Sequence, residues 1–418
     1  MEKTIYVYEC WSTPQTVLMG RMFVDTLRGK ESTSFEYDRT WLLEHPGQLF
    51  LDPDLQLYRG RQYAPMSKSL FGIFTDSCPD RWGRLLMKRR ESIIAHREQR
   101  KPRQLMESDY LLGVHDEARI GAIRFSLQPD GPFLAHDSDL AAPPWVTLRE
   151  LETASLAFEQ DEDTLNDRWL RQLLAPGSSL GGARPKATVK SPDGALWIAK
   201  FPSKHDDWDV GAWEQVIHDL AKACGLQVPD SRLEVFSPTG STYLVKRFDR
   251  KDNLRIHFAS AMSLLGKQDG DTGSSYLELA EFITAYGASS KADLLELWKR
   301  IVFSMAVSNT DDHLRNHGFL LTNRGWRLSP MYDVNPVPLG HSLSLNVSLD
   351  DARIDVDLAI ENAPFFGLKD FKEAKQIACQ ILSLVKQQWR PLAKEYGISH
   401  AAQDTMAPAF SLCNSLPL

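Results

Sequence analysis

Three polar residues in the second half of the chain have the spacing of a phosphoryl-transfer site. Asp311 is followed five positions later by Asn316, and Asp333 comes seventeen residues after Asn316. Kinase-type phosphotransferases place a base and two Mg²⁺ ligands at this spacing, on a loop and beyond the short hairpin that follows it. We therefore expect a loop, a hairpin and a second loop around these residues, and this expectation constrains the fold more than any other feature.

Phosphoryl transfer explains why these residue types are needed. The reaction asks a protein mainly to position the reactants and to neutralise charge. A carboxylate at Asp311 can align the attacking hydroxyl, while Asn316 and Asp333 can hold Mg²⁺ against the β- and γ-phosphates. His313 and His317 offer a rival zinc site at i and i+4, but zinc hydrolases of that spacing carry Glu directly after the first His, where this chain has a leucine.

Composition limits what such a site can belong to. With 418 residues, 43% of them hydrophobic, the chain can bury sizeable cores, and its length suggests two or three domains. A formal net charge of −7 provides no overall positive field for nucleic acid. Any DNA contact would therefore be local or made through a partner.

Cysteine usage and hydropathy favour a cytoplasmic protein. The five cysteines are odd in number, scattered and without metal-ligand spacing. They are Cys10, Cys78, Cys224, Cys379 and Cys413. The start of the chain shows no charged leader with an apolar core of signal-peptide length, and no run reaches about 18 apolar residues. We expect neither secretion nor a membrane partner.

The expected organisation has three parts. Residues 1–105 are predicted to form a small β-rich domain, with strands at Thr4–Tyr8, Gln15–Phe23 and Ser34–Tyr37. Residues 106–250 are predicted to form a kinase-like N-lobe, and residues 251–418 a mainly helical C-lobe.

The segment from Arg81 to Arg103 is predicted to be an amphipathic helix with a basic outer side. Nine of its residues are Lys or Arg and only two are Glu, while apolar residues such as Trp82 and Leu86 mark the inner side. A solvated helix face is the favoured interpretation. The alternative is a docking surface for nucleic acid or an acidic partner.

A loop rich in glycine and serine lies at Pro176–Lys186, before a predicted hairpin of Ala187–Lys190 and Leu196–Phe201. Glycines there would let backbone N–H groups approach phosphate oxygens closely. The loop is not a Walker A motif, because Gly182 is followed by alanine, and it lacks the G-x-G-x-x-G spacing of dinucleotide folds. Taken alone, it would be interpreted as a structural turn.

Lys200 ends the second strand of this hairpin among apolar residues, where an unpaired cation would be costly. In kinases the partners of such a lysine are a nucleotide phosphate and a helix Glu. A helix is predicted at 210–221, and Gly225 can end it. Glu214, at the edge of its apolar face, is our candidate to pair with Lys200; the alternative is a solvated glutamate.

Three further elements complete the prediction. A hairpin of Arg232–Phe236 and Thr242–Phe248 leads into the charged run 246–250, which is interpreted as a surface ion-pair cluster. The segment Leu294–Val307 is apolar on nearly every side and is predicted to be a buried helix that delivers Asn309–Asn316 to a cleft. A hairpin of 318–321 and 326–328 follows.

These residues resemble the HipA family of bacterial serine/threonine kinases, which are toxins of type II toxin–antitoxin modules. The matching segments are Ser179–Lys186, Ile198–Pro202, Arg247–Arg250, Asp311–Asn316 and Pro330–Asp333, and the region 71–84 is similar to the family's N-terminal domain, so the resemblance covers nearly the whole chain. It implies an α+β fold: a kinase-like core with a small β-rich N-terminal domain and an all-helical C-terminal lobe.

The resemblance also implies cofactors and roles. ATP and Mg²⁺ are the expected cofactors, with Asp311 as base, Asn316 and Asp333 as metal ligands and Lys200 in contact with ATP. The other residues expected at the nucleotide are Ser179, Gly181, Gly182, Lys186 and Glu214. Autophosphorylation of Ser179, or of Ser178, is expected to switch the kinase off.

The implied partners are a helix-turn-helix antitoxin, DNA only through that antitoxin, and a protein substrate, which in some members is an aminoacyl-tRNA synthetase. The chain departs from the family at Asp312, where some members have Gly, and in offering two serines in the loop. Two functions stay open: an active Ser/Thr protein kinase that acts as a growth-inhibiting toxin, or a kinase-fold binding module that mainly holds an antitoxin on operator DNA.

Overall fold

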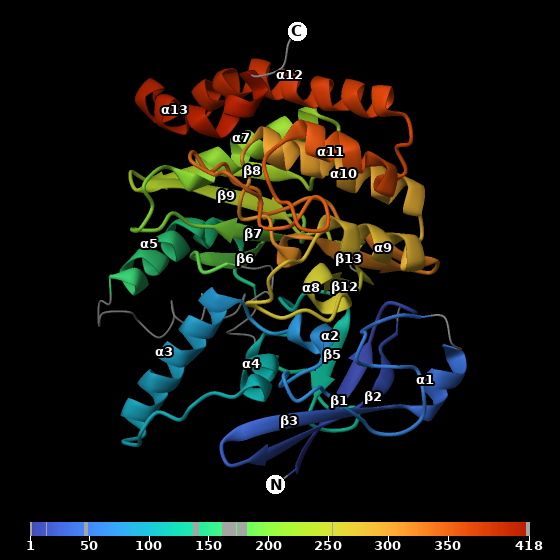
Figure 1. The fold of residues 1–418 in the computed structure, drawn as a ribbon. Helices are drawn as coiled ribbons and strands as arrows, with labels where there is room; N and C mark the ends of the chain where they lie inside the picture. Colours follow the sequence, from blue (N-terminus) through green and yellow to red (C-terminus); the bar gives the residue numbers. More distant parts are fainter. Residues whose placement is uncertain are drawn as a thin grey trace. The chain divides into compact units, whose positions relative to one another are not determined.

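The computed structural model covers residues 2–13, 15–45, 49–136, 142–160, 173, 182–252 and 254–414. Their contacts divide the chain into two units. Unit 1 consists of Met1–Ser203 and Lys246–Lys267, and unit 2 of Lys204–Val245 and Gln268–Leu418. Figure 1 shows the order of the helices and strands along the chain. The three-part division at residues 105 and 250 stays a prediction.

An antiparallel five-stranded sheet forms the N-terminal part of unit 1, with strand order β4-β3-β2-β1-β5. Its strands are β1 (Glu2–Glu9), β2 (Val17–Leu27), β3 (Lys30–Tyr37), β4 (Gln62–Tyr63) and β5 (Ile123–Ser126). The three strands predicted in this region are confirmed, with ends that differ by several residues. The α+β class is confirmed as well, since helices and sheets are both present.

Aromatic side chains fill the core beneath this sheet. Val7 on β1 lies opposite Phe125 on β5. The ring of Phe74, on the short helix α2 (Gly72–Thr75), lies 5.3 Å from the Phe35 ring and 6.0 Å from the Phe125 ring. All four side chains are fully buried, and burial of such side chains stabilises a fold by about 1.5–3 kcal/mol each.

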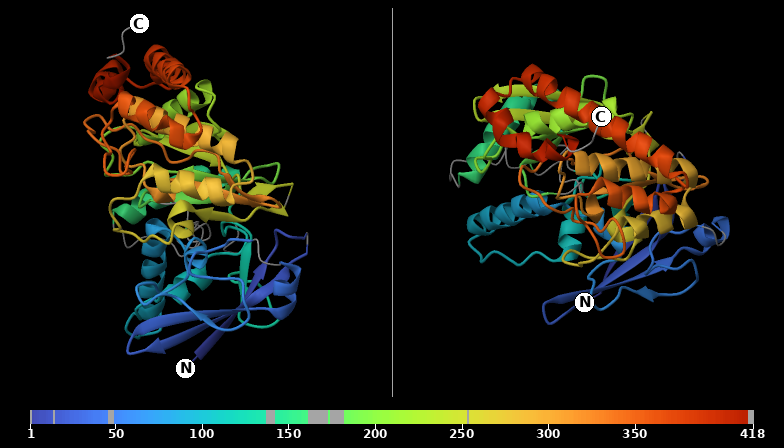
Figure 2. Two further views of the ribbon diagram at one scale, coloured as in Figure 1. Left: turned by 45° about the vertical axis from the view of Figure 1, so that its right-hand side comes forward. Right: turned by 45° about the horizontal axis from the view of Figure 1, so that its top comes forward.

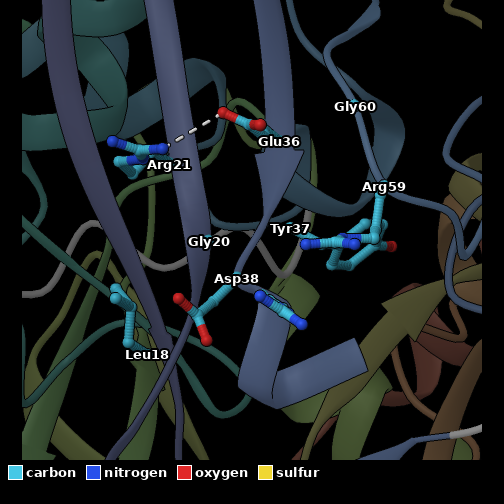
Figure 3. Close-up of a pocket in the computed structure, with 9 residues that line it drawn as sticks. Leu18, Gly20, Arg21, Glu36, Tyr37, Asp38, Arg59 and Gly60 are labelled. Carbon is cyan, nitrogen blue, oxygen red and sulfur yellow. Dashed lines mark hydrogen bonds and ion pairs between the residues drawn. The ribbon is translucent and has the colours of Figure 1, made fainter. Parts of the chain in front are cut away.

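Residues of β2 and β3 also line a polar cavity of about 180 Å³ (Figure 3). Gly20 lets β3 approach closely, since a Cβ at this position would lie 2.3 Å from the carbonyl oxygen of Glu36 and 2.5 Å from the Phe35 ring. Arg21 pairs with Glu36 across the strands at 3.2 Å, and both side chains are exposed. None of the predicted site residues lines this cavity.

The predicted basic helix is α3 (Arg81–Arg97), which begins at the cap Asp80. Part of its basic side is paired within the fold. Arg84 makes a two-pronged contact of 2.7 Å with Glu107, the first residue of α4 (Glu107–Gly113), and Arg100 lies 2.5 Å from Glu91. The basic side is therefore neither free nor uniformly solvated. Farther along unit 1 lies α5 (Leu148–Glu159).

The charged run after residue 246 is buried, so its interpretation as a surface cluster was wrong. Arg247 and Asp249 are 3% and 1% exposed. Asp249 accepts hydrogen bonds from the Arg247 side chain, from Arg250 Nη1 at 2.6 Å and from the backbone N–H of Gly121 at 2.8 Å. Burial alone would raise the pKa of Asp249, but the charges of Arg247 and Arg250 hold this pKa well below its usual range. Gly121 lies more than 120 residues away in sequence, whereas Arg247 and Arg250 are close neighbours of Asp249. A local sequence pattern could not show that these residues together enclose the carboxylate.

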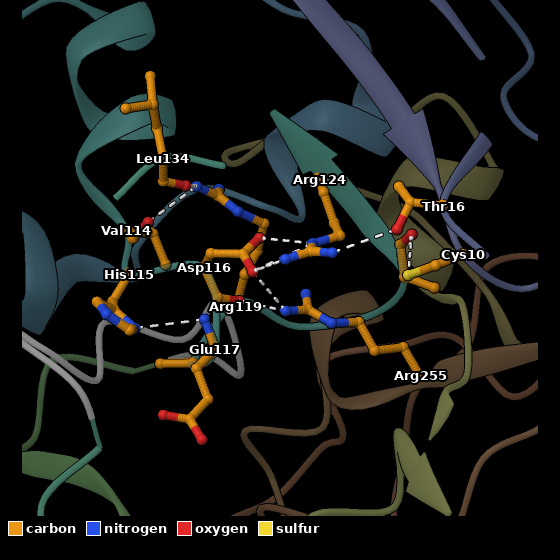
Figure 4. Close-up of polar contacts among 12 residues, drawn as sticks. Cys10, Thr16, Val114, His115, Asp116, Glu117, Arg119, Arg124, Leu134 and Arg255 are labelled. Atoms are coloured by element: carbon orange, nitrogen blue, oxygen red, sulfur yellow. Dashed lines mark hydrogen bonds and ion pairs between the residues drawn. The ribbon is translucent and has the colours of Figure 1, made fainter. Parts of the chain in front are cut away.

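Figure 4 shows a second ion network, which is centred on Asp116. Asp116 accepts hydrogen bonds from Arg124, on β5, and from Arg255, which belongs to the small hairpin of β10 (Arg250–Lys251) and β11 (Leu254–Arg255). Arg119 is fully buried and donates to the carbonyl oxygens of Val114 at 2.9 Å and of Leu134 at 3.0 Å. Together the two networks attach residues 246–255 to the segment that leads into β5. The strand β12 (Phe258–Ser260) and the helix α8 (Ala261–Leu264) follow.

Unit 2 is mainly helical. Its longest helix, α12 (Phe371–Glu395), packs against α7 (Val210–Ala223) and α10 (Ser290–Ala306), as the two views of Figure 2 show. The Trp389 ring stacks on Phe410 at 4.4 Å and lies 6.4 Å from Trp213. The remaining elements are β8 (Ser231–Ser237), β9 (Gly240–Lys246), α9 (Tyr276–Tyr286), β13 (Gly318–Thr322), β14 (Gly325–Leu328), α11 (Val356–Asn362) and α13 (His400–Met406).

The predicted helices at 210–221 and 294–307 are thus confirmed, and so are the three predicted hairpins. Gly225 has the left-handed φ of +74° that ends a helix, as expected. In the part of the chain that the structure describes, no helix has both the length and the apolar character needed to cross a bilayer.

Candidate active site

The loop that carries Asp311 and Asn316 leaves a rigid helix. Ten of the last eleven residues of α10 are buried, which explains its apolar sequence. Just beyond the end of the helix, Ser308 has a left-handed φ of +51°. The next residue, Asn309, donates a hydrogen bond from its N–H to the carbonyl oxygen of Ser304 at 2.8 Å. A single 3₁₀ turn, Leu314–Asn316, then leads into β13. Both ends of the loop therefore stand on regular structure.

Two adjacent aspartates in this loop have opposite environments. Asp311 is exposed, and its carboxylate makes no hydrogen bond or ion pair with any described residue. Asp312 is 3% exposed, and its carboxylate accepts a hydrogen bond of 2.5 Å from the Tyr276 hydroxyl. Of the two, only Asp311 can receive a proton from an external hydroxyl.

A histidine completes the surroundings of Asp312. The Nε2 atom of His317 lies 3.0 Å from Asp312 Oδ1, which is an ion-pair distance, so the contact is electrostatic. Burial alone would raise the pKa of Asp312, but the charges of His317 and His313 and the Tyr276 hydroxyl together hold the pKa below its usual range. His317 thus faces a carboxylate, and among the described residues no group of three or more His, Cys, Asp or Glu is arranged to hold a metal.

Asn316 presents an oxygen that lacks a partner. Its side-chain Nδ2 donates to the backbone carbonyl of Asp311 at 3.0 Å, which fixes the orientation of the amide. The Oδ1 atom is buried and accepts no hydrogen bond from the described part of the chain. A buried amide oxygen in this state is costly, and it is a ligand type that Mg²⁺ prefers. The residues present therefore fit a magnesium ion.

Asp333 is held against the same loop by its neighbours. The Tyr332 hydroxyl donates to the carbonyl oxygen of Arg315 at 2.7 Å, one residue before Asn316. Met331 N–H donates a hydrogen bond to the backbone carbonyl oxygen of Gln227 at 2.7 Å. Asp333 itself has a left-handed φ of +57°, which is unfavourable for a residue with a Cβ and is typical of functional positions. The structure thus brings the segment of Asp333 to the loop of Asn316, as the spacing predicted.

The segment after Asp333 is joined to the same loop. Asn335 N–H donates to Asn309 Oδ1 at 3.3 Å, and Ser344 Oγ donates to the carbonyl oxygen of Thr310 at 2.7 Å. Gly340 packs so closely that a Cβ would lie 2.1 Å from Thr310 Cγ2.

Glu214 is 5% exposed on α7, so the alternative of a solvated glutamate was wrong. Its pairing with Lys200 stays a prediction. Glu214 and Asp333 both lie close enough to Tyr243 to affect its hydroxyl. Burial raises the pKa of Tyr243 well above 10, and the charges of Glu214 and Asp333 raise this pKa further. Glu214 and Asp333 therefore act on one buried side chain within unit 2.

The N-lobe residues lie on the hairpin of β6 (Lys186–Lys190) and β7 (Leu196–Lys200), in unit 1. Lys200 ends β7 half-buried, after four buried residues. Lys186 is 7% exposed and already has an acidic partner, Asp80, at 2.9 Å. Gly182 has a φ of +91°, which favours glycine, and its carbonyl oxygen accepts from Lys186 Nζ at 3.4 Å. Ser178, Ser179 and Gly181 lie outside the described residues.

Tyrosines are what the sequence-based prediction missed. The Tyr332 and Tyr276 hydroxyls donate to residues of the Asp311–Asn316 loop or its immediate surroundings, yet the sequence assigned neither tyrosine a role. Tyr332 had the clearest signal, since it is a hydroxyl-bearing residue directly before Asp333. Tyr276 lies 35 residues before the loop and could not be connected to it by spacing.

Comparison with known proteins identifies the family. Residues 178–389, just over half of the chain, match the family model described as HipA-like C-terminal domain. The chain belongs to the HipA family. The match begins at the first loop serine and includes Lys200, Asp311, Asn316 and Asp333.

Curated relatives of this HipA-family chain are similar over a limited region. "Putative kinase Y4mE" of Sinorhizobium fredii is 28% identical in an alignment of 182 positions, which covers 37% of this chain and 41% of the relative. A "Putative kinase" of Haemophilus influenzae is 29% identical in an alignment of 187 positions, which covers 39% of this chain and 54% of the relative. The chain thus spans about half or less of the length of these relatives.

A solved structure supports the fold along the whole chain. HipA of Shewanella oneidensis, determined in complex with HipB and its operator DNA, superposes with a TM-score of 0.65 over 97% of this chain and 96% of that one. The sequences are only 16% identical, so this similarity concerns the fold.

Proposed function

We propose that this HipA-family chain is an ATP-dependent serine/threonine protein kinase in which Asp311 is the catalytic base. The observation that supports it is the contrast within the loop. Asp311 is exposed and without a partner among the described residues, whereas Asp312 is buried and paired. A carboxylate that must accept a proton from a substrate hydroxyl has to be unoccupied and accessible.

Asn316 Oδ1 and the Asp333 carboxylate would hold Mg²⁺ in this proposal. The ion would neutralise charge on the β- and γ-phosphates of ATP. Lys200 would contact the nucleotide phosphates, with Glu214 as its acidic partner, and the backbone of Gly181 and Gly182 would cover the phosphates. Since Lys186 already pairs with Asp80, we expect it to support the loop base as well as the nucleotide.

The proposed step is a single transfer. The substrate hydroxyl gives its proton to Asp311, and its oxygen forms a bond to the γ-phosphorus. The bond between the γ-phosphorus and the bridging oxygen breaks, and ADP leaves with that oxygen. Because a base that only orients the acceptor acts in the transition state, its loss should lower the rate more than the ATP affinity.

Regulation and partners follow from the family. We propose autophosphorylation of Ser179 or Ser178, since a phosphate of about −1.5 to −2 charges in a loop that covers ATP would repel the nucleotide. A helix-turn-helix antitoxin is the proposed partner, DNA is contacted through it, and an aminoacyl-tRNA synthetase is a candidate substrate for a toxin of this type. All five cysteines are free, which suits a reducing cytoplasm.

The experiment separates catalysis from binding. Purified wild type, Asp311→Ala and the control Asp350→Ala, which removes an exposed carboxylate of the same unit, are incubated with Mg²⁺ and γ-labelled ATP. We expect transfer to be nearly abolished in Asp311→Ala alone, and ATP affinity to fall in Lys200→Ala and Asp333→Asn. Full transfer by Asp311→Ala would assign the base elsewhere. ATP binding without transfer in wild type would favour the binding module, which mainly assembles with an antitoxin on operator DNA.

A further inference from the structure

A buried polar cluster lies directly behind the loop that carries the proposed base. We define it as Asp312, Tyr276 and His317. Asp312 accepts a hydrogen bond from the Tyr276 hydroxyl, has an electrostatic contact with His317, and accepts a longer hydrogen bond of 3.5 Å from Ser304 Oγ. The Tyr276 and His317 rings also meet edge to face, with centroids 5.6 Å apart. All three side chains are at most 4% exposed, so the cluster cannot touch a substrate.

The cluster joins both ends of the loop. Asp312 directly follows the proposed base Asp311, and His317 directly follows the proposed metal ligand Asn316. Their contact therefore closes the six-residue segment 312–317, and the hydrogen bond from Asn316 Nδ2 to the Asp311 carbonyl oxygen spans nearly the same residues. The separation of the base and the metal ligand is thus fixed by contacts that are not part of the chemistry.

Tyr276 gives this segment a rigid attachment. It is the first residue of α9, whose cap Ser275 accepts from Glu278 N–H while the Glu278 carboxylate accepts from Ser275 N–H. Tyr276 N–H also donates to the carbonyl oxygen of Asn346 at 2.9 Å. The backbone at Tyr276 is held from two sides, so its hydroxyl can fix the position of Asp312.

The energetics explain why the cluster acts as a unit. A buried carboxylate is expensive unless it is paired and hydrogen-bonded, and removal of one partner leaves the other uncompensated. If the Tyr276 hydroxyl is lost, Asp312 keeps only the 3.5 Å hydrogen bond from Ser304 Oγ and the contact with His317. Its carboxylate then gains hydration by moving outward, and Asp311 moves with it. A misplacement of about 1 Å at a catalytic group can cost about 100-fold in rate.

We propose that Asp312, Tyr276 and His317 are positioning residues that hold Asp311 and Asn316 in the arrangement that phosphoryl transfer needs. The proposal rests on the proposed kinase function and adds the residues that set its geometry. It also assigns a role to Asp312, the position at which this chain departs from family members that have glycine.

The test compares two tyrosines with matched contacts. Tyr276→Phe removes the hydroxyl that donates to Asp312, and the control Tyr396→Phe removes a hydroxyl that donates to Asp219 at 2.5 Å, away from the loop but in the same unit. For each variant we would measure kcat and KM for ATP in the labelled-phosphate assay, and amide hydrogen exchange of residues 309–317. Tyr276→Phe is expected to lower kcat by about 10- to 100-fold with little change in KM. It is also expected to speed exchange in the loop, while Tyr396→Phe leaves both unchanged.

A conservative variant protects the test against misfolding. Asp312→Asn keeps an acceptor for the Tyr276 hydroxyl and should retain more activity than Asp312→Ala. An unchanged kcat in Tyr276→Phe, or an equal fall in Tyr396→Phe, would overturn the proposal. If wild type transfers no phosphate, the proposed function itself fails. In that case amide hydrogen exchange of residues 309–317 still tests the positioning role. Unchanged exchange in Tyr276→Phe would overturn this role, and faster exchange confined to the loop would support it.

Discussion

Replacement of Asp249 by alanine is expected to destabilise unit 1 by about 3–4 kcal/mol. Asp249 is 1% exposed and accepts four hydrogen bonds: two from Arg247, one from Arg250 and one from Gly121 N–H. The substitution leaves two guanidinium groups without their carboxylate. Loss of one partner of a buried ion pair typically costs about 3–5 kcal/mol.

The structure places the effect in the lower part of that range. Arg247 Nη1 still donates to the carbonyl oxygen of Ala118 at 2.6 Å, and Arg250 Nη2 still donates to that of Arg119 at 2.7 Å. These carbonyl groups keep the guanidinium groups partly satisfied after Asp249 is removed. Asp249→Asn, which retains one acceptor oxygen but no charge, should lie between Asp249→Ala and wild type.

The assay must report on unit 1 alone, since the two units need not unfold together. Native-state hydrogen exchange of the amides in β1, β2 and β5 gives the free energy of opening there. The control is Glu36→Ala, which breaks the exposed pair with Arg21 and should cost less than about 1 kcal/mol. Equal, small losses in Asp249→Ala and Glu36→Ala would refute the reasoning that burial gives this network its weight.

Two further predictions concern pH and packing. Burial raises the pKa of Asp52 from 3.8 to about 6, so the folded state retains a proton that the unfolded state has lost, and stability falls as pH rises from about 4 to about 6. Asp52→Asn should remove up to about 3 kcal/mol of this pH-dependent loss of stability. The free energy of unfolding of wild type and variant would be measured at both pH values, and an equal pH dependence in the two proteins would contradict the prediction. Gly340→Ala should lower transfer by about 10- to 100-fold, because the new Cβ would lie 2.1 Å from Thr310 Cγ2 and 2.9 Å from Ser308 Oγ and would displace the loop. Thr310→Ser removes the closer of these two contacts and should restore part of the activity; no recovery would exclude the Thr310 methyl group as the cause.

Local patterns were sufficient to predict several elements of this fold. Short apolar segments on both sides of a turn that contains glycine predicted the hairpins β6–β7 and β13–β14, because turn residues and their neighbours can be recognised within a few positions. Helical spacing and Gly225 predicted α7 and its end. These features depend on interactions within about twenty residues, so they can be inferred without knowledge of the tertiary structure.

Burial of charge could not be inferred in this way. The run at residues 246–250 has the same composition as a surface cluster, and only the approach of residues 117–121 encloses it. Similarly, Glu214 lies at the edge of an apolar helix face, a position compatible with solvent or core. In both cases the deciding neighbours are distant in sequence, and a charge becomes buried only where those neighbours supply its partners.

The pair Asp311 and Asp312 shows how much the tertiary structure adds to a motif. Sequence spacing selected Asp311 as the base, but two adjacent carboxylates in one loop are chemically equivalent until their surroundings are known. The structure distinguishes them: Asp312 is buried and contacts Tyr276 and His317, whereas Asp311 is exposed. Asp312 can accept a proton from outside only if the contacts with Tyr276 and His317 open. The same contacts leave Asp311 as the proposed base and, because Asp311 is the adjacent residue in the chain, they also restrict the movement of Asp311. A base that must meet a mobile substrate hydroxyl within hydrogen-bonding distance benefits from such an anchor, because orientation supplies much of the rate in phosphoryl transfer.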